Sequence, residues 1–400
     1  MNDETRAFVA AHRMENVRDL ALHAKRGDAV NLPLALDQIA GWQTARTKLP
    51  DWAACDGVVY PPHLSMEQCS SQSTARYKAG VAKRIVGSDA AANGLLVDLT
   101  GGFGVDFSYM ARVFGHATYV ERQPVLCELA EHNMAALGVA HARIVNDEAE
   151  HFLQGMDQAT LVFLDPARRD AHGARTYAIA DCTPDVLALA DALLAKAPHV
   201  MVKLSPMLDW HKTVEDFAGL VHEVHIVCAG DECKELLLVI GRDRCTSPHM
   251  YCVDDDRVID YKIGSDERTG TASDAYDPAD ARFLYEPNAS IMKAGCFALT
   301  EHRFGVHQIA PNSHLFTSIK PVAGFPGRSF AIDAVCTMNK RELRHALEGV
   351  GRANIATRNF PMSVAALRNK LKLKDGGNVY LFATTSSSGT HLLFRTSKTA

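Results

Sequence analysis

A glycine-rich turn directly after an apolar β-like run is the strongest chemical feature of this sequence. The run LLVDL at 95–99 contains Asp98 and leads into Thr100, Gly101, Gly102 and Gly104. Glycines let the backbone turn sharply and approach a ligand closely. A dinucleotide site favours G-x-G-x-x-G, and an acid at this point would repel a pyrophosphate. A carboxylate at Asp98 suits the ammonium group of a methionine moiety instead.

Two further acids stand at the ends of the next β-like runs. Glu121 ends the run ATYVE, and Asp147 follows the run ARIVN. A carboxylate at the first position can accept hydrogen bonds from both ribose hydroxyls of a nucleoside, and one at the second can accept from an adenine amino group. Because the carboxyl ends of parallel strands form the ligand crevice of an open α/β sheet, the three acids predict one nucleoside-binding site.

The elements that carry these acids alternate between β and α character. Helix-like stretches separate apolar runs at 95–99, 117–121, 142–146, 161–165 and 200–204. This alternation predicts an α/β fold with a doubly wound, Rossmann-like parallel sheet. The last two runs, 222–229 and 234–241, are joined by four residues, too few for a parallel crossover. We therefore expect the last strand to be antiparallel.

The chain also divides by pattern and by charge. We predict a helical region at 1–90, a cofactor-binding α/β domain at 91–245, a small module at 246–322 and an α/β module at 323–400. The last module carries twelve Lys and Arg against four Asp and Glu, a charge of +8, whereas the whole chain has −5. A basic module on an acidic body suits an anionic partner such as nucleic acid.

Local patterns predict the elements of the two C-terminal modules. The stretch 252–263 has strand character, and 287–299 is predicted to be a helix opened by Pro287. A Pro- and Gly-rich segment at 321–328 is typical of a linker. After it, 329–396 is predicted to form strand, helix, strand, helix and hairpin in that order.

The cysteines and the N-terminus indicate the compartment. The ten cysteines include no CxxC pair, so we expect free thiols and no metal site. The first residues are polar and lack the apolar core of a signal peptide. No stretch approaches the roughly 18–20 apolar residues of a membrane span, so we expect a cytoplasmic protein with no membrane partner.

Taken together, these motifs resemble the class I S-adenosylmethionine-dependent methyltransferases. Asp98 to Gly104 matches the first motif of that family, with Thr100 where a glycine is more usual. Glu121 matches the ribose-binding acid, and Asp147 matches the adenine-contacting position. The resemblance implies S-adenosylmethionine as the cofactor.

A more specific resemblance extends over nearly the whole chain. The segments QIAGWQTARTKLP, EQCSSQSTARYKA, DPARR, YEPNASIMKAG and RNFPMSVAALRNKLKLK are similar to those of a bacterial methyltransferase family with a THUMP-like C-terminal domain. It implies a ferredoxin-like module at 246–322 and a THUMP-like module at 323–400. Since THUMP domains bind RNA, it also implies an RNA substrate, tRNA or rRNA. The basic residues Arg368, Lys370 and Lys372 are then candidates for contacting it.

The fourth run ends at the catalytic position of this fold, in Asp165, Pro166, Ala167, Arg168 and Arg169. This resembles the acid-Pro-Pro-aromatic motif of amino-group methyltransferases, in which a side chain and a backbone carbonyl hold an exocyclic NH2. Ala167 and Arg168 depart from that motif, although arginine can stack on a base and pair with phosphate. A base amino group is the favoured acceptor. Arg168 and Arg169 are predicted either to bind substrate or to form surface salt bridges.

A second acceptor chemistry involves Lys203, at the end of the fifth run. With Asp165, Glu235 and either Lys78 or Lys83, it is similar to the Lys-Asp-Lys-Glu set of some ribose 2′-O-methyltransferases. A lysine beside carboxylates can help to deprotonate a hydroxyl. The same residues could instead form a buried ion pair that joins strand ends. Carbon-5 methylation is disfavoured because no cysteine is expected beside Asp165 or Lys203.

The sequence therefore predicts an S-adenosylmethionine-dependent methyltransferase that acts on RNA. Two alternatives stay open: a methyltransferase for a small molecule or a protein, and a non-catalytic RNA-binding protein with a degenerate site.

Overall fold

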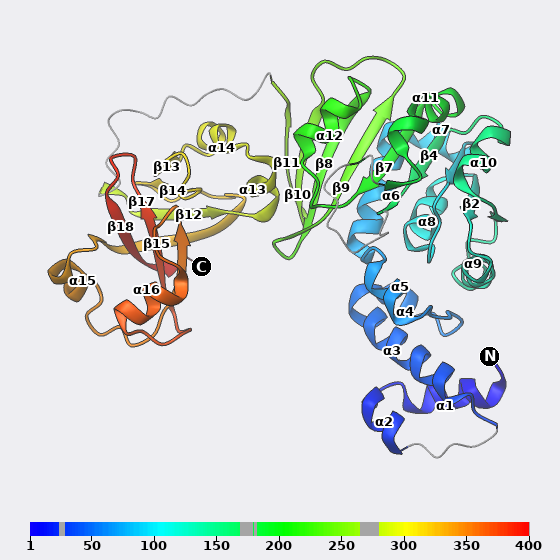
Figure 1. The fold of residues 1–400 in the computed structure, drawn as a ribbon, viewed down its shortest axis with the longest axis horizontal. Coiled ribbons are helices and arrows are strands. Elements are labelled where there is room, and N and C mark those ends of the chain that lie inside the picture. The colour runs from blue at the N-terminus through cyan, green and yellow to red at the C-terminus, as the bar shows by residue number, and fades with distance from the viewer. Residues whose placement is uncertain (24–28, 169–178, 180–181, 265–279, 400) are drawn as a thin grey trace. The chain divides into compact units, whose positions relative to one another are not determined.

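The computed structural model describes residues 1–23, 29–168, 179, 182–264 and 280–399, in two compact units (Figure 1). The first unit comprises Met1–Ala229 and Lys234–Pro248. The second comprises Gly230–Cys233 and His249–Ala400. Each unit is described by itself.

The first unit opens with the predicted helical region. Its helices are α1 (Asp3–His12), α2 (Val17–His23), α3 (Leu32–Lys48), α4 (Pro50–Ala53), α5 (His63–Gln68), α6 (Gln72–Val86) and α7 (Ser88–Ala92). Side-chain caps fix where the two long ones begin, because a cap satisfies an otherwise unpaired backbone donor. Asn31 accepts from the Leu34 N–H at 3.2 Å before α3, and Ser71 accepts from the Thr74 N–H at 3.3 Å before α6.

A twisted sheet with the order β8-β9-β7-β4-β1-β2-β3 forms the centre of the first unit. Its strands are β1 (Leu95–Asp98), β2 (His116–Glu121), β3 (Ala142–Asn146), β4 (Leu161–Leu164), β7 (His199–Leu204), β8 (Val221–Ala229) and β9 (Glu232–Gly241). Strands β3, β2, β1, β4 and β7 pair in parallel, and β9 pairs antiparallel with β7. The predicted doubly wound sheet with an antiparallel last strand is confirmed.

Helices connect the parallel strands, as right-handed crossovers require. They are α8 (Val105–Met110), the 3-10 helix η1 (Ala111–Val113), α9 (Pro124–Ala136), α10 (Ala149–Gly155), α11 (Val186–Lys196) and α12 (Trp210–Asp216). A separate two-stranded ribbon, β5 (Ala167–Arg168) with β6 (Cys182–Thr183), follows β4.

One apolar core joins the N-terminal helices to the sheet. The same buried cluster contains Trp52 on α4, Ala75 on α6, Phe107 on α8 and Leu237 on β9. All four are fully buried. Because these side chains share one core, the N-terminal helices cannot be removed without exposing apolar surface of the sheet.

The second unit contains a hairpin and a seven-stranded sheet of order β13-β14-β12-β15-β18-β17-β16. Its strands are β10 (His249–Asp254), β11 (Arg257–Lys262), β12 (Phe283–Pro287), β13 (His307–Gln308), β14 (Phe316–Ser318), β15 (Gly327–Thr337), β16 (Asn354–Arg358), β17 (Val379–Thr385) and β18 (His391–Lys398). Its helices are α13 (Ala289–Ala294), α14 (Phe297–Phe304), α15 (Lys340–Ala346) and α16 (Val364–Leu371).

For the second unit, the strand character of 252–263 is confirmed without its turn, and the prediction for 287–299 is wrong in detail. The strand-like stretch 252–263 turns back on itself as the hairpin β10–β11, with Asp255 in the left-handed region at φ 51°. Aspartate tolerates that conformation better than most residues. The turn was not predicted from the sequence pattern. The predicted helix at 287–299 is two helices, because Gly295 ends α13 at φ 72°.

Pro287 closes a strand and does not open a helix. It is the last residue of β12, and Asn288 is the cap of α13, accepting from the Ile291 N–H at 3.1 Å. The order of elements from β15 to β18 follows the prediction. Because β12 pairs with β15, one sheet spans the segment 321–328 that the sequence suggested as a linker.

Among the described residues, no helix combines the length and the apolar character needed to cross a membrane.

The carboxylate of Glu286 on β12 joins that strand to β15 and β16 of the second unit's sheet. It is 5% exposed and accepts from Arg328 Nε and from Arg358 Nη2, both at 2.8 Å. We expect Glu286→Gln to destabilise this unit by about 1–3 kcal/mol, since a partly buried charge-assisted pair is weakened at constant shape. Hydrogen exchange should then quicken in β12, β15 and β16 peptides and stay unchanged in β1, β2 and β4. Equal exchange in Glu286→Gln and in the exposed control Glu348→Gln would contradict this.

Candidate active site

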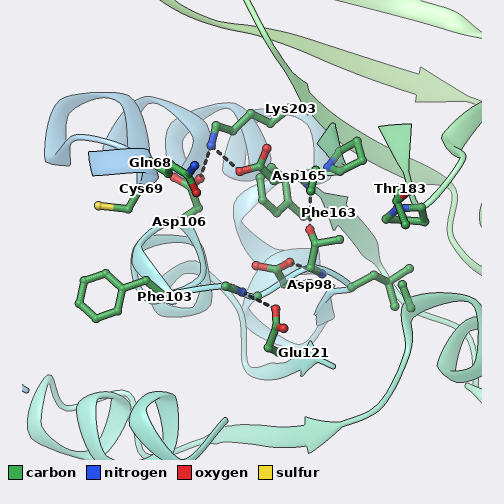
Figure 2. Close-up of a pocket in the computed structure, with 18 of the residues that line it drawn as sticks. Gln68, Cys69, Asp98, Phe103, Asp106, Glu121, Phe163, Asp165, Thr183 and Lys203 are labelled. Atoms are coloured by element: carbon green, nitrogen blue, oxygen red, sulfur yellow. Dashed lines mark hydrogen bonds and ion pairs between the residues drawn. The ribbon is translucent and has the colours of Figure 1, made fainter. Parts of the chain in front are cut away.

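A cavity of about 820 Å³ lies at the carboxyl ends of the parallel strands of the first unit (Figure 2). Ten of the residues that the sequence assigned to the cofactor or to catalysis line it: Asp98, Thr100, Gly101, Gly102, Gly104, Glu121, Asp147, Asp165, Pro166 and Lys203. Strand topology explains this convergence, because β1, β2, β4 and β7 all end at the same edge of the sheet.

The glycine turn needs its glycines for two different reasons. Gly102 and Gly104 have φ values of 55° and 86°, in the left-handed region that favours glycine. A Cβ on Gly101 would lie 2.1 Å from the Tyr119 ring, so a side chain there would clash. The Tyr119 hydroxyl donates to the Gly102 carbonyl and holds the turn against β2.

Glu121 reaches the same turn from the end of β2. Its Oε2 accepts from the Gly102 N–H at 3.0 Å, and its Oε1 accepts from the Gln123 N–H at 2.9 Å. The side chain is therefore oriented by backbone donors on both sides. Glu121 also lines the cavity.

Asp98 has a buried carboxylate oxygen without a partner. The residue is 1% exposed, and Oδ1 accepts from the Thr100 N–H at 3.0 Å, whereas Oδ2 has no hydrogen bond within the described part of the chain. Burial raises the pKa of Asp98 well above its ordinary value, and the nearby carboxylates of Asp106 and Asp165 add to that effect. An unpaired buried carboxylate is costly, and a cationic ligand would remove the cost.

Asp147 is less available than the sequence suggested. Both of its carboxylate oxygens lie 2.8 Å from His151 Nδ1, and Oδ1 also accepts from the Glu148 N–H at 2.8 Å. The side chain still lines the cavity.

Thr100 has a contact that explains its departure from glycine. Its Oγ1 accepts from the backbone N–H of Asp165 at 2.6 Å. This hydrogen bond joins the turn after β1 to the turn after β4. The residue that differs from the family motif therefore ties the predicted cofactor end of the cavity to the predicted acceptor end.

Behind the acceptor end lies an ion-pair chain formed by Glu235, Lys78, Asp106, Lys203 and Asp165. Lys203 Nζ lies 2.5 Å from Asp165 Oδ2 and 3.7 Å from Asp106 Oδ2 (Figure 2). Lys78 Nζ lies 3.2 Å from Asp106 Oδ1 and 2.6 Å from Glu235 Oε2. Carboxylates and ammonium groups alternate along the whole chain.

Lys78 is the upstream lysine of this set. It is 0% exposed, whereas Lys83, the other candidate, is exposed on the same helix. A fully buried ammonium must be paired, because desolvation of an isolated charge is costly. Glu235, at 2% exposure, supplies that partner from β9.

The ion-pair chain holds Lys203 as a cation. Burial alone would lower the pKa of Lys203, but the charges of Asp165 and Asp106 outweigh it and raise that pKa. For Asp106, burial alone would raise the pKa, and the charges of Lys78 and Lys203 outweigh it and lower that pKa. Both charged forms are therefore favoured in the folded protein.

The cavity also contains residues that the sequence reasoning missed. The sequence patterns gave no role to Asp106, which follows the glycine turn, and its place at the start of α8 was the available signal. Gln68 and Cys69 line the cavity from the end of α5, although no sequence pattern linked that segment to the site. The expectation of no cysteine beside the site is therefore wrong. Burial raises the pKa of Cys69, so its thiol is a poor nucleophile, and carbon-5 chemistry stays disfavoured.

The structure does not place the predicted substrate residues relative to this cavity. Arg169 lies outside the described residues, and the backbone of Arg168 pairs with Cys182 in the short ribbon β5–β6. Arg368, Lys370 and Lys372 belong to the second unit, on and just after α16. Arg368 Nη2 lies 2.6 Å from Asp375, whereas Lys370 and Lys372 are exposed. Within the described ranges, no group of three or more His, Cys, Asp or Glu is arranged to hold a metal ion.

Neutralising Asp98 should stabilise the ligand-free protein, and more so at high pH. A carboxyl whose pKa is raised by folding contributes stability that is lost as pH rises from its unfolded pKa to its folded pKa. Asp98→Asn removes that loss, so we expect its melting temperature to exceed the wild-type value by a margin that grows from pH 5 to pH 9. Thermal unfolding across that range tests this. A margin independent of pH, as expected for the exposed control Asp157→Asn, would contradict it.

Comparison with known proteins agrees with this geometry. Residues 327–398 match the THUMP domain-like family model, and residues 283–326 match a ferredoxin-like domain model. A provisionally assigned methyltransferase from Porphyromonas gingivalis W83, known from its crystal structure, is 29% identical, with a TM-score of 0.85 over 99% of this chain and 98% of that one. Uncharacterized S-adenosylmethionine-dependent methyltransferases from two Mycobacterium tuberculosis strains, CDC 1551 and H37Rv, are 24% identical over 330 residues, 81% of this chain and 84% of theirs. The chain is therefore similar over most of its length to S-adenosylmethionine-dependent methyltransferases, and it carries a THUMP-like domain at the C-terminus.

Proposed function

We propose that this enzyme methylates RNA and that the acceptor is a ribose 2′-hydroxyl. The observation that carries the proposal is the contact of 2.5 Å between the Lys203 ammonium and the Asp165 carboxylate at the catalytic position, backed by the buried remainder of the ion-pair chain. The RNA substrate and the acceptor atom are the parts of the assignment that go beyond the methyltransferase class.

The cofactor end of the cavity fits the methionine and ribose of S-adenosylmethionine. The unpaired Oδ2 of Asp98 suits an ammonium donor, and the backbone of Gly102 and Gly104 leaves room for close approach. Glu121, oriented by two backbone donors, would accept from the ribose hydroxyls. Asp147 would contact adenine only by sharing its carboxylate with His151 or by exchanging that partner.

Electrostatics distinguish an oxygen acceptor from a nitrogen acceptor. When a neutral amino group attacks a methyl cation equivalent, positive charge develops on its nitrogen, and a neighbouring ammonium opposes that change. When a hydroxyl attacks, it loses a proton, and a neighbouring ammonium stabilises the oxygen. Because Lys203 is held as a cation, its charge favours the hydroxyl.

The residues of this chain would act on the acceptor as follows. The bound cofactor supplies a methyl group activated on a sulfonium. Lys203 donates a hydrogen bond to the acceptor oxygen, and Asp165 accepts the hydroxyl proton as the new C–O bond forms and the C–S bond breaks. The Asp165 side chain is 40% exposed, so an acceptor can reach it, and Thr100 fixes its backbone. Lys203 orients and stabilises the oxygen and does not serve as the base.

A base amino group is the second candidate acceptor. Asp165 and Pro166 keep the first half of the amino-group motif, and both line the cavity. In that chemistry the carboxylate of Asp165 and the carbonyl of Pro166 would accept from the NH2 group. Ala167 stands where the motif has its second proline, and Arg168 stands where it has its aromatic residue, which weakens this candidate.

An RNA substrate is supported by the second unit. It contains the THUMP domain-like region and the charge of +8 that lies on 323–400. Lys370 and Lys372 are exposed and free to approach phosphates, whereas Arg368 would have to share its guanidinium with Asp375. Arg168 and Arg169 stay candidates for substrate contact. A tRNA or rRNA substrate implies that the enzyme acts in the cytoplasm.

The Asp98 carboxylate should control cofactor affinity. We expect Asp98→Asn to weaken S-adenosylhomocysteine binding by about tenfold to a hundredfold, the range for losing one charge-assisted hydrogen bond. Because burial raises the pKa of Asp98, wild-type affinity should fall as pH is lowered toward that pKa, and the variant should lose this dependence. Calorimetry over a pH series measures both effects. Equal affinity of wild type and variant at every pH would remove Asp98 from the cofactor site.

The acceptor is identified by transferring labelled methyl groups to RNA from a strain that lacks the gene. Alkaline hydrolysis cannot cleave next to a 2′-O-methyl ribose, so we expect the label in dinucleotides, with base-methylated mononucleotides unlabelled. Lys203→Met should lower turnover by about a hundredfold or more while cofactor binding persists. The matched control Lys212→Met, on the exposed face of α12, should keep full activity.

The other outcomes assign the alternatives. Label in mononucleotides would select the base amino group. Label on protein or small molecules, with none in RNA, would reject an RNA substrate. Absence of cofactor binding in calorimetry would favour an RNA-binding protein with a degenerate site.

A further inference from the structure

Asp106 lies at the centre of the ion-pair chain, although neither the glycine motif nor the Lys-Asp-Lys-Glu resemblance includes it. It is the second residue of α8, directly after the cofactor turn, and is 9% exposed. We propose that Asp106 is a positioning residue that holds Lys203 in place for methyl transfer. The inference rests on the proposed function, in which Lys203 stabilises the acceptor oxygen.

The contacts of Asp106 place its carboxylate between two ammonium groups. Oδ1 lies 3.2 Å from Lys78 Nζ, and Oδ2 lies 3.7 Å from Lys203 Nζ. Ser70 Oγ donates to Oδ2 at 2.7 Å and accepts from Lys78 Nζ at 3.2 Å. Two ammonium groups this close would repel each other without an intervening negative charge.

Lys203 needs a second anchor because Asp165 alone does not define its position. A lysine side chain carries a compact charge on a flexible chain of four carbons, so a single ion pair leaves the ammonium mobile. Both carboxylates line the cavity, but the Asp165 side chain is 40% exposed, whereas Asp106 is buried. Figure 2 shows the Lys203 ammonium between these two carboxylates. Its position is therefore fixed from both sides.

The same carboxylate couples three parts of the first unit. Asp106 follows Gly104 by two residues, so the cofactor turn sets its backbone. Ser70, just before α6, and Lys78, on α6, bring the N-terminal helical region to it. The acceptor machinery therefore depends on residues of 1–90, which lie outside the sheet that carries the cofactor motif.

The isosteric variant Asp106→Asn tests this role. It keeps the side-chain shape and the hydrogen bond from Ser70 but removes the charge. We expect kcat on RNA to fall by about tenfold to a hundredfold, while the affinity for S-adenosylhomocysteine and the KM for RNA stay within about twofold. A structural defect would lower binding and activity together. The exposed helix residue Asp191, changed to Asn, is the matched control and should leave all three values unchanged.

A double variant separates charge repulsion from other effects. In Asp106→Asn the two lysines face each other across an amide, so removing one ammonium with Lys78→Gln should restore part of the lost activity. We therefore expect the combined loss to be smaller than the product of the two single losses. A combined loss equal to the product of the two single losses would show that Asp106 does not separate the charges of Lys78 and Lys203.

A readout without RNA keeps this test apart from the test of the proposed function. The ammonium ¹H–¹⁵N signal of a lysine persists in NMR spectra only when the group is held and shielded from exchange. We expect the Lys203 signal, assigned with Lys203→Met, in the wild type and its loss in Asp106→Asn. An unchanged signal would overturn the positioning role whatever the RNA assay gives. If Asp106→Asn loses the signal but the wild-type enzyme does not methylate RNA, the positioning role stands and only the proposed function is rejected.

Discussion

The burial of Lys78 is the constraint on which the rest of this site depends. An ammonium that is 0% exposed has to find carboxylates inside the protein, and it finds Glu235 and Asp106 at 2.6 and 3.2 Å. Those two partners come from β9 and α8, so one charge ties the N-terminal helix α6 to both the sheet and the cofactor turn. Replacing any member alone would strand a buried charge, which makes the arrangement cooperative.

This cooperativity explains why the N-terminal helices and the sheet share one core. Packing of apolar side chains such as Phe107 and Leu237 brings α6 against α8 and β9 without fixing their register. The alternating charges supply the register, because only one placement satisfies Lys78, Asp106 and Glu235 together. At the front of the cavity, the Thr100 hydroxyl joins the turns after β1 and β4 by accepting from the Asp165 N–H.

Much of this molecule could be predicted from the sequence because its signals are local. The acids at strand ends, the glycine turn and the short link between β8 and β9 follow from period and spacing. Asp106, Gln68 and Cys69 could not be found in this way, because their place in the cavity depends on how α5 and α6 pack on the sheet. The sequence did not predict the hairpin turn at Asp255 or the end of β12 at Pro287, because each of these residue types suits two local conformations.

The charges of the cavity bear on how an RNA could bind at all. The ion-pair chain has three carboxylates and two ammonium groups, and Asp98, Glu121 and Asp147 line the same cavity. A phosphodiester gains nothing from that surface, and a cationic cofactor compensates only part of its charge. The binding free energy of a polyanion must then come mainly from cations elsewhere, and residues 323–400 hold a charge of +8. Under the proposed function, RNA affinity and chemistry therefore reside in different parts of the chain, and salt should weaken RNA binding far more than methyl transfer.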